Sequence, residues 1–222
     1  MTTGHTPIEE YGFLSDRRGS ALVSAEGSVD WLCLPDFDSA ACMASVLGDE
    51  QHGRWLLRPA DPRARATRRY LTDSLVLETT WECDGATATV VEFMPTGNRR
   101  SDLIRRVEGI RGEMSWRHEW CVRPWYGSRR PLVQLVEQRG RQALVAVDGP
   151  DRYELKGPHL AEPDAQGRLV GEFTVEAGEC VEFDMVWHPS TMREPEPRTA
   201  ADTLEATLAV DREWLVDCGY EG

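Results

Sequence analysis

The sequence predicts a mostly β protein, folded as an antiparallel β-sandwich with a short helix and a C-terminal linker helix. Three observations predict this fold. Apolar and polar residues alternate along many short segments, which is the period of strands with one buried face. Gly-containing pairs separate these segments at short intervals, as tight turns do in antiparallel sheets. The chain has 222 residues, of which 41% are hydrophobic, and is long enough to bury the core of one large all-β domain.

The strand predictions are taken in chain order. Ser28–Leu34 alternates after the turn-forming pair Glu26-Gly27. Asp84-Gly85 separates two β-rich runs, 75–83 and 86–94, and predicts a tight hairpin because both turn positions favour residues that tolerate positive φ. The later strand-like runs are Asp102–Ile110, Met114–Val122, Leu132–Gln138, Gln142–Val147, Leu169–Val175 and Cys180–Trp187.

One of these strands leaves a choice between core and ligand platform. Trp116, His118 and Trp120 lie on one face of the run Met114–Val122, because side chains alternate along a strand. An exposed row of this kind is a platform for stacking sugars, whereas a buried row is core. Cysteines inside strands, such as Cys180, are expected to be small buried hydrophobes.

Two helices are expected to interrupt the strands. The first is short and rich in small residues, over Ala40–Leu47, and Gly48 ends it. The second begins after Thr199, whose side chain can cap the first turn together with Asp202, and Gly219 can close it. Its broad apolar face carries Leu204, Leu208 and Leu215, with Trp214 beside it.

These elements divide the chain into two parts. Residues 1–192 are expected to form the β-sandwich domain, and residues 193–222 a linker and an interdomain helix. The linker is the stretch Arg193–Arg198, which is rich in Pro, Glu and Arg. A capped amphipathic helix behind a linker is expected to connect to a following domain. The alternative is that the helix packs back onto the sheets.

Charge and composition exclude several classes of protein. The formal net charge of −13 disfavours a nucleic-acid partner, since such proteins neutralise phosphates with basic residues. This charge is compatible with a neutral saccharide, and equally with acidity that only maintains solubility. No stretch approaches ~18 apolar residues, and the N-terminus lacks the apolar core of a signal peptide. We therefore expect no membrane partner, and a cytoplasmic location with reduced thiols.

No cofactor and no metal are expected from the motifs of the chain. None of the six cysteines forms a Cys-x-x-Cys pair, and no spacing of cysteine and histidine is typical of a zinc site. The sequence also lacks a phosphate loop, a dinucleotide fingerprint and the Gly-x-Ser-x-Gly motif of a nucleophilic serine.

A candidate binding loop lies at the end of the first predicted strand. Its residues are Trp31, Asp36, Phe37 and Asp38. Flat aromatic faces beside carboxylates suit a sugar, whose C–H face stacks and whose hydroxyl groups form hydrogen bonds with the carboxylates. Two alternatives stay open: the aromatic side chains belong to the core, and the aspartates cap the turn.

A series of short motifs runs along nearly the whole chain. They are Pro7–Leu14, Ala21–Ser24, Gly27–Pro35, His52–Trp55, Arg68–Leu71, Leu75–Trp81, Phe93–Pro95, Asp102–Arg105, Val107–Gly109 and Trp187–Ser190. In this order they resemble the N-terminal part of bacterial glycoside hydrolase family 15 proteins, the glucoamylase-like and trehalase-like enzymes. The resemblance implies a β-sandwich of the supersandwich type.

In the family that the chain resembles, a catalytic (α/α)6 barrel follows the N-terminal sandwich. The barrel carries both catalytic carboxylates, so no residue of this chain is expected to be catalytic. The implied reaction is hydrolysis of an α-glucosidic bond with inversion, by a general acid and a general base. The implied partners are the barrel, in cis or as a separate chain, and a glucoside or other small-molecule ligand. The loop Asp36–Asp38 would contact the barrel or line the mouth of its sugar pocket.

Two other functions stay open at this point. The chain can be a freestanding carbohydrate-binding or interaction module, or a freestanding enzyme whose cleft serves another small molecule. Three motifs depart from the family pattern. Phe37–Ala40 ends in Ala where Pro is usual, and Pro124–Gly127 reads Pro-Trp-Tyr-Gly where Phe-Asp-Tyr-Gly is usual. Ser15–Ser20 is altered around the usual Arg-Thr-Ala-Ala. Because loops carry function on rigid scaffolds, these changes bear on whether the partner or substrate of the family is kept.

Overall fold

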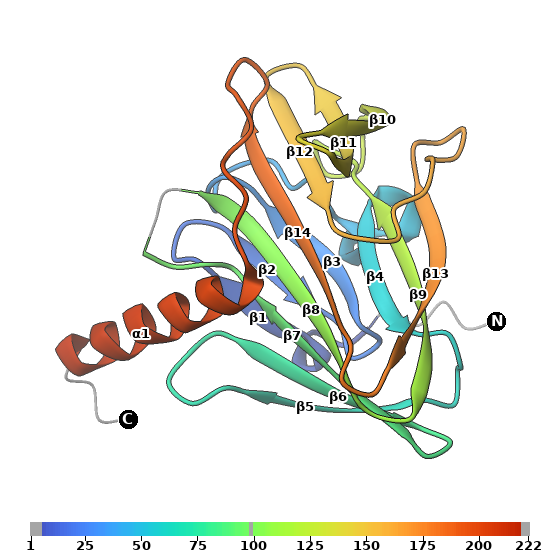
Figure 1. Ribbon diagram of the computed structural model, residues 1–222. Helices are drawn as coiled ribbons and strands as arrows, with labels where there is room; N and C mark the ends of the chain where they lie inside the picture. The colour runs from blue at the N-terminus through green and yellow to red at the C-terminus, as the bar shows by residue number, and fades with distance from the viewer. Residues whose placement is uncertain (1–5, 98–99, 219–222) are drawn as a thin grey trace.

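Two antiparallel β-sheets face each other in the computed structural model, which describes residues 6–97 and 100–218 (Figure 1). One sheet has the strand order β1-β2-β3-β4-β9-β13, and the other has the order β10-β11-β12-β14-β8-β7-β6-β5. Neighbouring strands pair antiparallel in both sheets. The prediction of a mostly β, antiparallel sandwich is confirmed.

The elements of the two sheets have the following bounds. The six-stranded sheet consists of β1 (Gly12–Ser15), β2 (Ser20–Val23), β3 (Ser28–Cys33), β4 (Arg54–Pro59), β9 (Glu113–Cys121) and β13 (Leu169–Glu176). The eight-stranded sheet consists of β5 (Arg65–Tyr70), β6 (Leu77–Cys83), β7 (Ala86–Phe93), β8 (Ser101–Arg111), β10 (Leu132–Gln138), β11 (Arg141–Asp148), β12 (Asp151–Lys156) and β14 (Cys180–Pro189). Three short 3-10 helices, η1 (Ile8–Glu10), η2 (Ser45–Leu47) and η3 (Glu50–His52), and one α-helix, α1 (Ala200–Cys218), complete the described elements.

The hairpin between β6 and β7 forms at the predicted pair of residues. Asp84 and Gly85 have φ values of 44° and 85°, and Cys83 pairs with Ala86 across the turn. Both turn residues therefore lie in the left-handed region, which the twist of a two-residue hairpin requires. Asp tolerates this region better than most residues, and Gly enters it without steric cost.

The core between the two sheets is rich in tryptophan. Trp55, Trp116 and Trp120 are fully buried, so the aromatic row on β9 belongs to the core and is not a sugar platform. His118 lies between the two tryptophans of β9, and Trp55 Nε1 donates to His118 Nε2 at 2.9 Å. Burial, with a smaller contribution from the Arg105 charge, lowers the pKa of His118 to about 3. The imidazole is therefore neutral at physiological pH.

A buried arginine links the two layers. Arg105 of β8 has no exposed surface, and its Nη2 lies 2.6 Å from the Glu92 carboxylate on β7. The same guanidinium donates to the carbonyl oxygens of Trp55 and Gly27, at 2.7 and 2.8 Å. Trp55 lies on β4 and Gly27 directly precedes β3, so one side chain of the eight-stranded sheet holds the backbone of the six-stranded sheet. Burial lowers the pKa of the Arg105 guanidinium.

The helix expected over Ala40–Leu47 is wrong. Among these residues only Ser45–Leu47 is helical, as a single 3-10 turn. The Leu32 N–H donates to the Met43 carbonyl at 3.1 Å, and the Cys42 N–H donates to the Leu32 carbonyl at 2.9 Å. The segment therefore pairs with β3. A helix of two turns is marginal on its own, and the pairing together with burial of the small side chains outweighs it.

The C-terminal helix α1 begins where the sequence predicts. The Asp202 N–H donates to Thr199 Oγ1 at 3.2 Å, so Thr199 is the N-cap. The expected closing residue, Gly219, lies outside the described residues. Within residues 6–97 and 100–218, no helix, α1 included, has the length and apolar character needed to cross a membrane.

The first half of α1 packs on the outer face of the eight-stranded sheet. The apolar contact consists of Val76, Phe93, Ile104 and Ala200, with Leu71, Val91, Leu204 and Leu208 packed against them. Asp211 is also buried and forms an ion pair with Arg17 at 2.7 Å. Beyond Asp211 the helix projects away from the sandwich, and Trp214, Leu215 and Val216 are exposed (Figure 1). Of the predicted apolar face, only Leu204 and Leu208 therefore contact the sheet.

Cys180 is exposed, which contradicts the expectation that it is a buried hydrophobe. It is the first residue of β14 and points to the outer side of the sheet, whereas the neighbouring Val181 points into the core. The period-two alternation predicts the strand correctly but leaves open which face is inside.

Candidate functional site

The loop after β3 carries three of the residues predicted to form a site. The Asp36 N–H donates to Ser39 Oγ at 3.1 Å, and the Ser39 N–H donates to the Asp36 carbonyl at 3.0 Å, so Ser39 closes a tight turn. Arg18 Nη2 donates to the Asp36 carboxylate at 2.8 Å. Phe37 is 53% exposed, and Asp38 is exposed beside it. The turn Asp36–Ser39, which we call the acidic turn, therefore presents an aromatic ring and a carboxylate to the surface.

Trp31, the fourth predicted residue, lies apart from this turn. It is half-buried on β3 and packs against a small cluster of Cys33, Ala41 and Ala44. Its ring centroid lies 5.9 Å from that of Tyr126, at an interplanar angle of 36°. The structure therefore brings Trp31 together with an aromatic residue that sequence reasoning did not select.

Tyr126 belongs to a loop with an unusual backbone. Trp125, Tyr126 and Gly127 have consecutive φ values of 56°, 59° and 88°. Left-handed conformation is uncommon for bulky residues and costs about 1–3 kcal/mol at each one. Trp125 is nevertheless 49% exposed and Tyr126 46% exposed, so burial of the two rings does not explain the conformation. The Arg129 guanidinium lies over the Trp125 ring, 4.6 Å from its centroid.

Backbone hydrogen bonds join this loop to the segment that follows the acidic turn. The Arg123 N–H donates to the Cys42 carbonyl at 2.8 Å, and the Tyr126 N–H donates to the Ala41 carbonyl at 3.0 Å. We call Trp31, Trp125 and Tyr126 the aromatic loop cluster. It displays the residue types that dominate binding energies at interfaces, but it contains no carboxylate pair placed for acid–base chemistry.

The sequence holds one signal for the two missed residues. Pro124–Gly127 is one of the motifs that depart from the family pattern, with Trp125 at the position where Asp is usual. Because most tryptophans of a sandwich belong to the core or to a domain interface, a tryptophan followed by a tyrosine does not by itself indicate a ligand site. The left-handed backbone that turns both rings outward is visible only in three dimensions.

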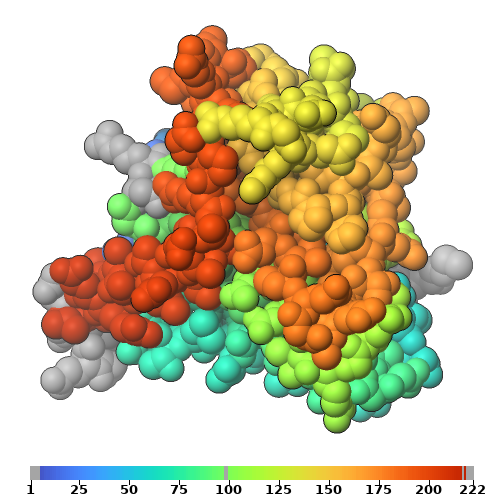
Figure 2. Space-filling view, in the orientation of Figure 1, coloured from blue at the N-terminus to red at the C-terminus, as the bar shows by residue number. Residues whose placement is uncertain are grey.

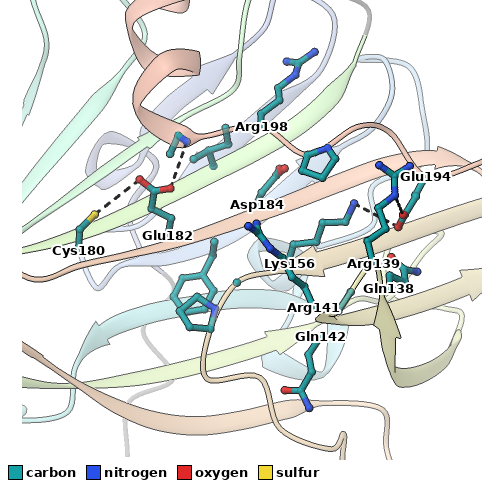
Figure 3. Close-up of a pocket in the computed structure, with 17 residues that line it drawn as sticks. Gln138, Arg139, Arg141, Gln142, Lys156, Cys180, Glu182, Asp184, Glu194 and Arg198 are labelled. Atoms are coloured by element: carbon teal, nitrogen blue, oxygen red, sulfur yellow. Dashed lines mark hydrogen bonds and ion pairs between the residues drawn. The ribbon is translucent and has the colours of Figure 1, made fainter.

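A hollow lies elsewhere, on the outer face of the eight-stranded sheet. The segment 193–199, which we call the strap, crosses this face between β14 and α1 (Figure 1). A cavity of about 820 Å³ opens between the strap and strands β10, β11, β12 and β14. Figure 2 shows the recess beside the strap. Its polar lining includes Arg139, Arg141, Lys156, Asp184, Glu194 and Arg198 (Figure 3).

Buried charges hold the floor of this region. Arg100 pairs with Asp102 at 2.6 Å and with Asp184 at 2.8 Å, and Arg198 of the strap lies 3.9 Å from Asp102. Burial, followed by the nearby Asp184 charge, raises the pKa of Asp102 to about 7. Burial also raises the pKa of Asp184. Two carboxylates thus share one closely bound guanidinium, and the ionised form of the pair is disfavoured.

The strap is also held by ion pairs at its N-terminal end. Arg139 Nε lies 2.7 Å from Glu194, and Lys156 Nζ lies 3.9 Å from the same residue. Lys156 also contacts the fully buried Glu154, which accepts from Arg152 at 2.6 Å. The strap is therefore attached to the sheet by side-chain charges and not by strand pairing.

The sequence of the chain is similar to those of known proteins. Residues 2–157 match the family model described as trehalase-like, N-terminal. The chain belongs to this family. A trehalase of Mycolicibacterium smegmatis is 47% identical over 230 residues, which covers 94% of this chain and 34% of that protein. A trehalase of Mycobacterium tuberculosis is 43% identical over 105 residues, covering 45% of this chain and 15% of that protein. The chain thus spans about a third or less of the length of these trehalases.

A solved structure agrees with the fold. A bacterial glucoamylase complexed with acarbose superposes with a TM-score of 0.54 at 9% sequence identity, over 94% of this chain and 35% of that chain. At this identity the likeness shows the fold alone. The resemblance to the trehalase-like and glucoamylase-like proteins is confirmed, whereas the roles of Trp31, Asp36, Phe37 and Asp38 stay predictions.

Proposed function

We propose that this trehalase-like N-terminal domain docks on a catalytic (α/α)6 barrel, in cis or as a separate chain. In this proposal the domain supports the barrel and lines one side of the mouth of its sugar pocket. The whole protein would hydrolyse an α-glucosidic bond with inversion, in the cytoplasm and without a nucleic-acid partner. The length of the related trehalases supports a further catalytic region, since this chain covers 34% of the M. smegmatis protein.

The observation that carries the proposal is the aromatic loop cluster. Two adjacent aromatic residues hold a strained backbone while about half of each side chain stays exposed. Strain of this kind persists where the surrounding structure enforces it, and it concentrates at binding sites. Trp, Tyr and Arg are the residue types enriched at the energetic centres of interfaces, and Trp125, Tyr126 and Arg129 supply all three.

The acidic turn extends this contact surface. Phe37 offers an exposed ring, and the exposed Asp38 carboxylate can accept hydrogen bonds from hydroxyl groups or from basic residues of a partner. Arg18 fixes Asp36, so the turn is ordered before contact. An ordered loop loses little conformational entropy on docking.

The test uses a chimera in which this chain replaces the matching region of the M. smegmatis trehalase. Trp125→Ala and Tyr126→Ala should each weaken docking by about 2 kcal/mol or more, as truncation of an interface anchor does. Glucose release from trehalose and the thermal midpoint of the chimera should both fall. The isolated chain should keep its own midpoint and should release no glucose at any pH.

The matched control is Ile110→Ala, which removes an apolar side chain that is 52% exposed at the end of β8. It should change neither activity nor midpoint. If the two aromatic variants behave like this control in the chimera, the aromatic loop cluster is not the docking surface and the proposal fails.

A further inference from the structure

The strap cavity has the size and construction of a ligand site. Its volume of about 820 Å³ lies within the range of about 300–1,000 Å³ that is typical of small-molecule pockets. Its walls come from four separate parts of the chain: β8, the segment from β10 to the residues just after β12, β14, and the strap with the first residue of α1. None of these residues belongs to the aromatic loop cluster.

Opposite charges balance around the cavity. Arg139 and Lys156 face Glu194, and Arg198 approaches the Asp102 and Asp184 pair on the same side. A ligand with a net charge would meet charges of both signs and would be repelled by one of them. The lining therefore favours a neutral ligand.

Two polar groups in the cavity are left for such a ligand. The Arg141 guanidinium makes no hydrogen bond or ion pair with the rest of the described chain. Oδ1 of Asp184 is buried and has no hydrogen-bond partner there. Figure 3 shows the Arg141 and Asp184 side chains in one view of the hollow. One offers donors and the other an acceptor, which together match hydroxyl groups because a hydroxyl both donates and accepts.

Apolar groups complete the lining. Ile104, Pro158, Phe183 and Pro197 contribute to the walls. A combination of apolar wall, guanidinium and carboxylate suits a molecule with a C–H face and a rim of hydroxyl groups. We propose that the strap cavity binds a neutral mono- or disaccharide, and that the bound sugar holds the strap closed against the sheet.

Closure of the strap follows from where its residues lie. Glu194, Pro197 and Arg198 line the cavity from the strap, and Ala200 lines it from the first turn of α1. A sugar that contacts both the sheet and these residues binds the closed arrangement better than an open one, so binding shifts the population toward closure. This proposal does not rest on the docking role of the aromatic loop cluster.

The test measures binding of glucose, maltose and trehalose to the full chain by titration calorimetry at sugar concentrations up to about 20 Kd. Amide exchange of residues 193–199 is followed in parallel, and should slow when sugar is bound. Arg141→Ala should weaken binding at least tenfold, and Asp184→Asn should weaken it by a similar factor. The control Arg65→Ala removes an exposed arginine from the edge strand β5 and should bind like the unchanged chain.

Several results would overturn the proposal. These are the absence of binding at millimolar sugar, equal affinity in the Arg141→Ala variant, and tighter binding of inorganic phosphate or sulfate than of any sugar. Loss of sugar binding in Trp125→Ala but not in Arg141→Ala would place the ligand on the aromatic loop cluster instead. Failure of the chimera experiment above has no bearing on these outcomes, since they are measured on this chain alone.

Discussion

Replacement of Arg105 tests how the two layers are held together. Arg105→Met keeps much of the side-chain volume but removes the charge and all donors. It leaves the Glu92 carboxylate buried without its partner at 2.6 Å, and it removes the Arg105 donor from the carbonyl oxygens of Trp55 and Gly27. The Gly27 carbonyl keeps a second donor, the Leu57 N–H at 3.0 Å. The guanidinium also lies 5.1 Å from the centroid of the Trp55 ring, a contact that Met restores only in part.

The expected loss of stability is large. Removing one partner of a buried ion pair costs about 3–5 kcal/mol, because an uncompensated charge stays inside. Loss of the donor to the Trp55 carbonyl adds up to about 1–3 kcal/mol, less whatever a rearranged neighbour or a water recovers. We therefore expect Arg105→Met to lose about 4 kcal/mol or more. The double variant with Glu92→Met should recover about 1–3 kcal/mol of the summed single losses, because it leaves no lone charge.

Urea denaturation followed by tryptophan fluorescence is the appropriate assay, because three fully buried tryptophans lie in the core. Four proteins complete a double-mutant cycle: the unchanged chain, the two single variants and the double variant. A loss below about 1 kcal/mol for Arg105→Met would place this pair among weakly contributing surface pairs. Strict additivity of the single losses would show that Arg105 and Glu92 do not interact. The first result would refute the interlayer role of Arg105, and the second would refute its pairing with Glu92.

Three further predictions concern the surface, the buried acids and the helix. Phe37→Ala should change the free energy of unfolding of this chain by no more than ~0.5 kcal/mol, since the ring is exposed; a loss near ~3 kcal/mol in urea would show that the ring is core. The pKa of Asp102, raised to about 7, means that the native state binds more protons than the unfolded state between roughly pH 4 and 7. Stability should therefore fall as pH rises through this window, and denaturation at pH 5 and pH 7.5 should show a smaller fall in Asp102→Asn, in which only the raised pKa of Asp184 remains. Amide exchange should show residues 200–211 of α1 protected and residues 212–218 opening at much lower free energy, because only the first half packs on the sheet; equal protection of both halves would contradict this.

Local sequence patterns were sufficient to predict features that depend on a few neighbouring residues, such as a tight hairpin and the start of a helix. Asp84-Gly85 predicts its hairpin because the turn chemistry needs only two residues, and Thr199 predicts the start of α1 because an N-cap acts within one turn. Short strands such as β1 and β2 carry too few residues for period two to be distinctive. Their existence depends on pairing with β3, which lies further along the chain.

Tertiary contacts explain where the sequence-based prediction was wrong and where it selected no residue. The segment 40–47 reads as a helix by composition, but backbone pairing with β3 competes successfully for its hydrogen bonds. The motif predicts the acidic turn. The contact of Tyr126 with Trp31 depends instead on the hydrogen bond from the Tyr126 N–H to the Ala41 carbonyl, which joins two segments that are distant in the sequence. The strap cavity assembles residues from 104 to 200, and no spacing rule in the sequence brings them together.

Lys156, which lines the strap cavity, is the single lysine of the chain. Apart from an α-amino group, an amine-selective reagent therefore has one target, and that target contacts both Glu154 on the sheet and Glu194 on the strap. The acylation rate of Lys156, measured by mass spectrometry of one peptide, therefore reports how readily the strap opens, also in a mixture with other proteins. The arginine-rich composition thus provides a reporter position without any engineered label.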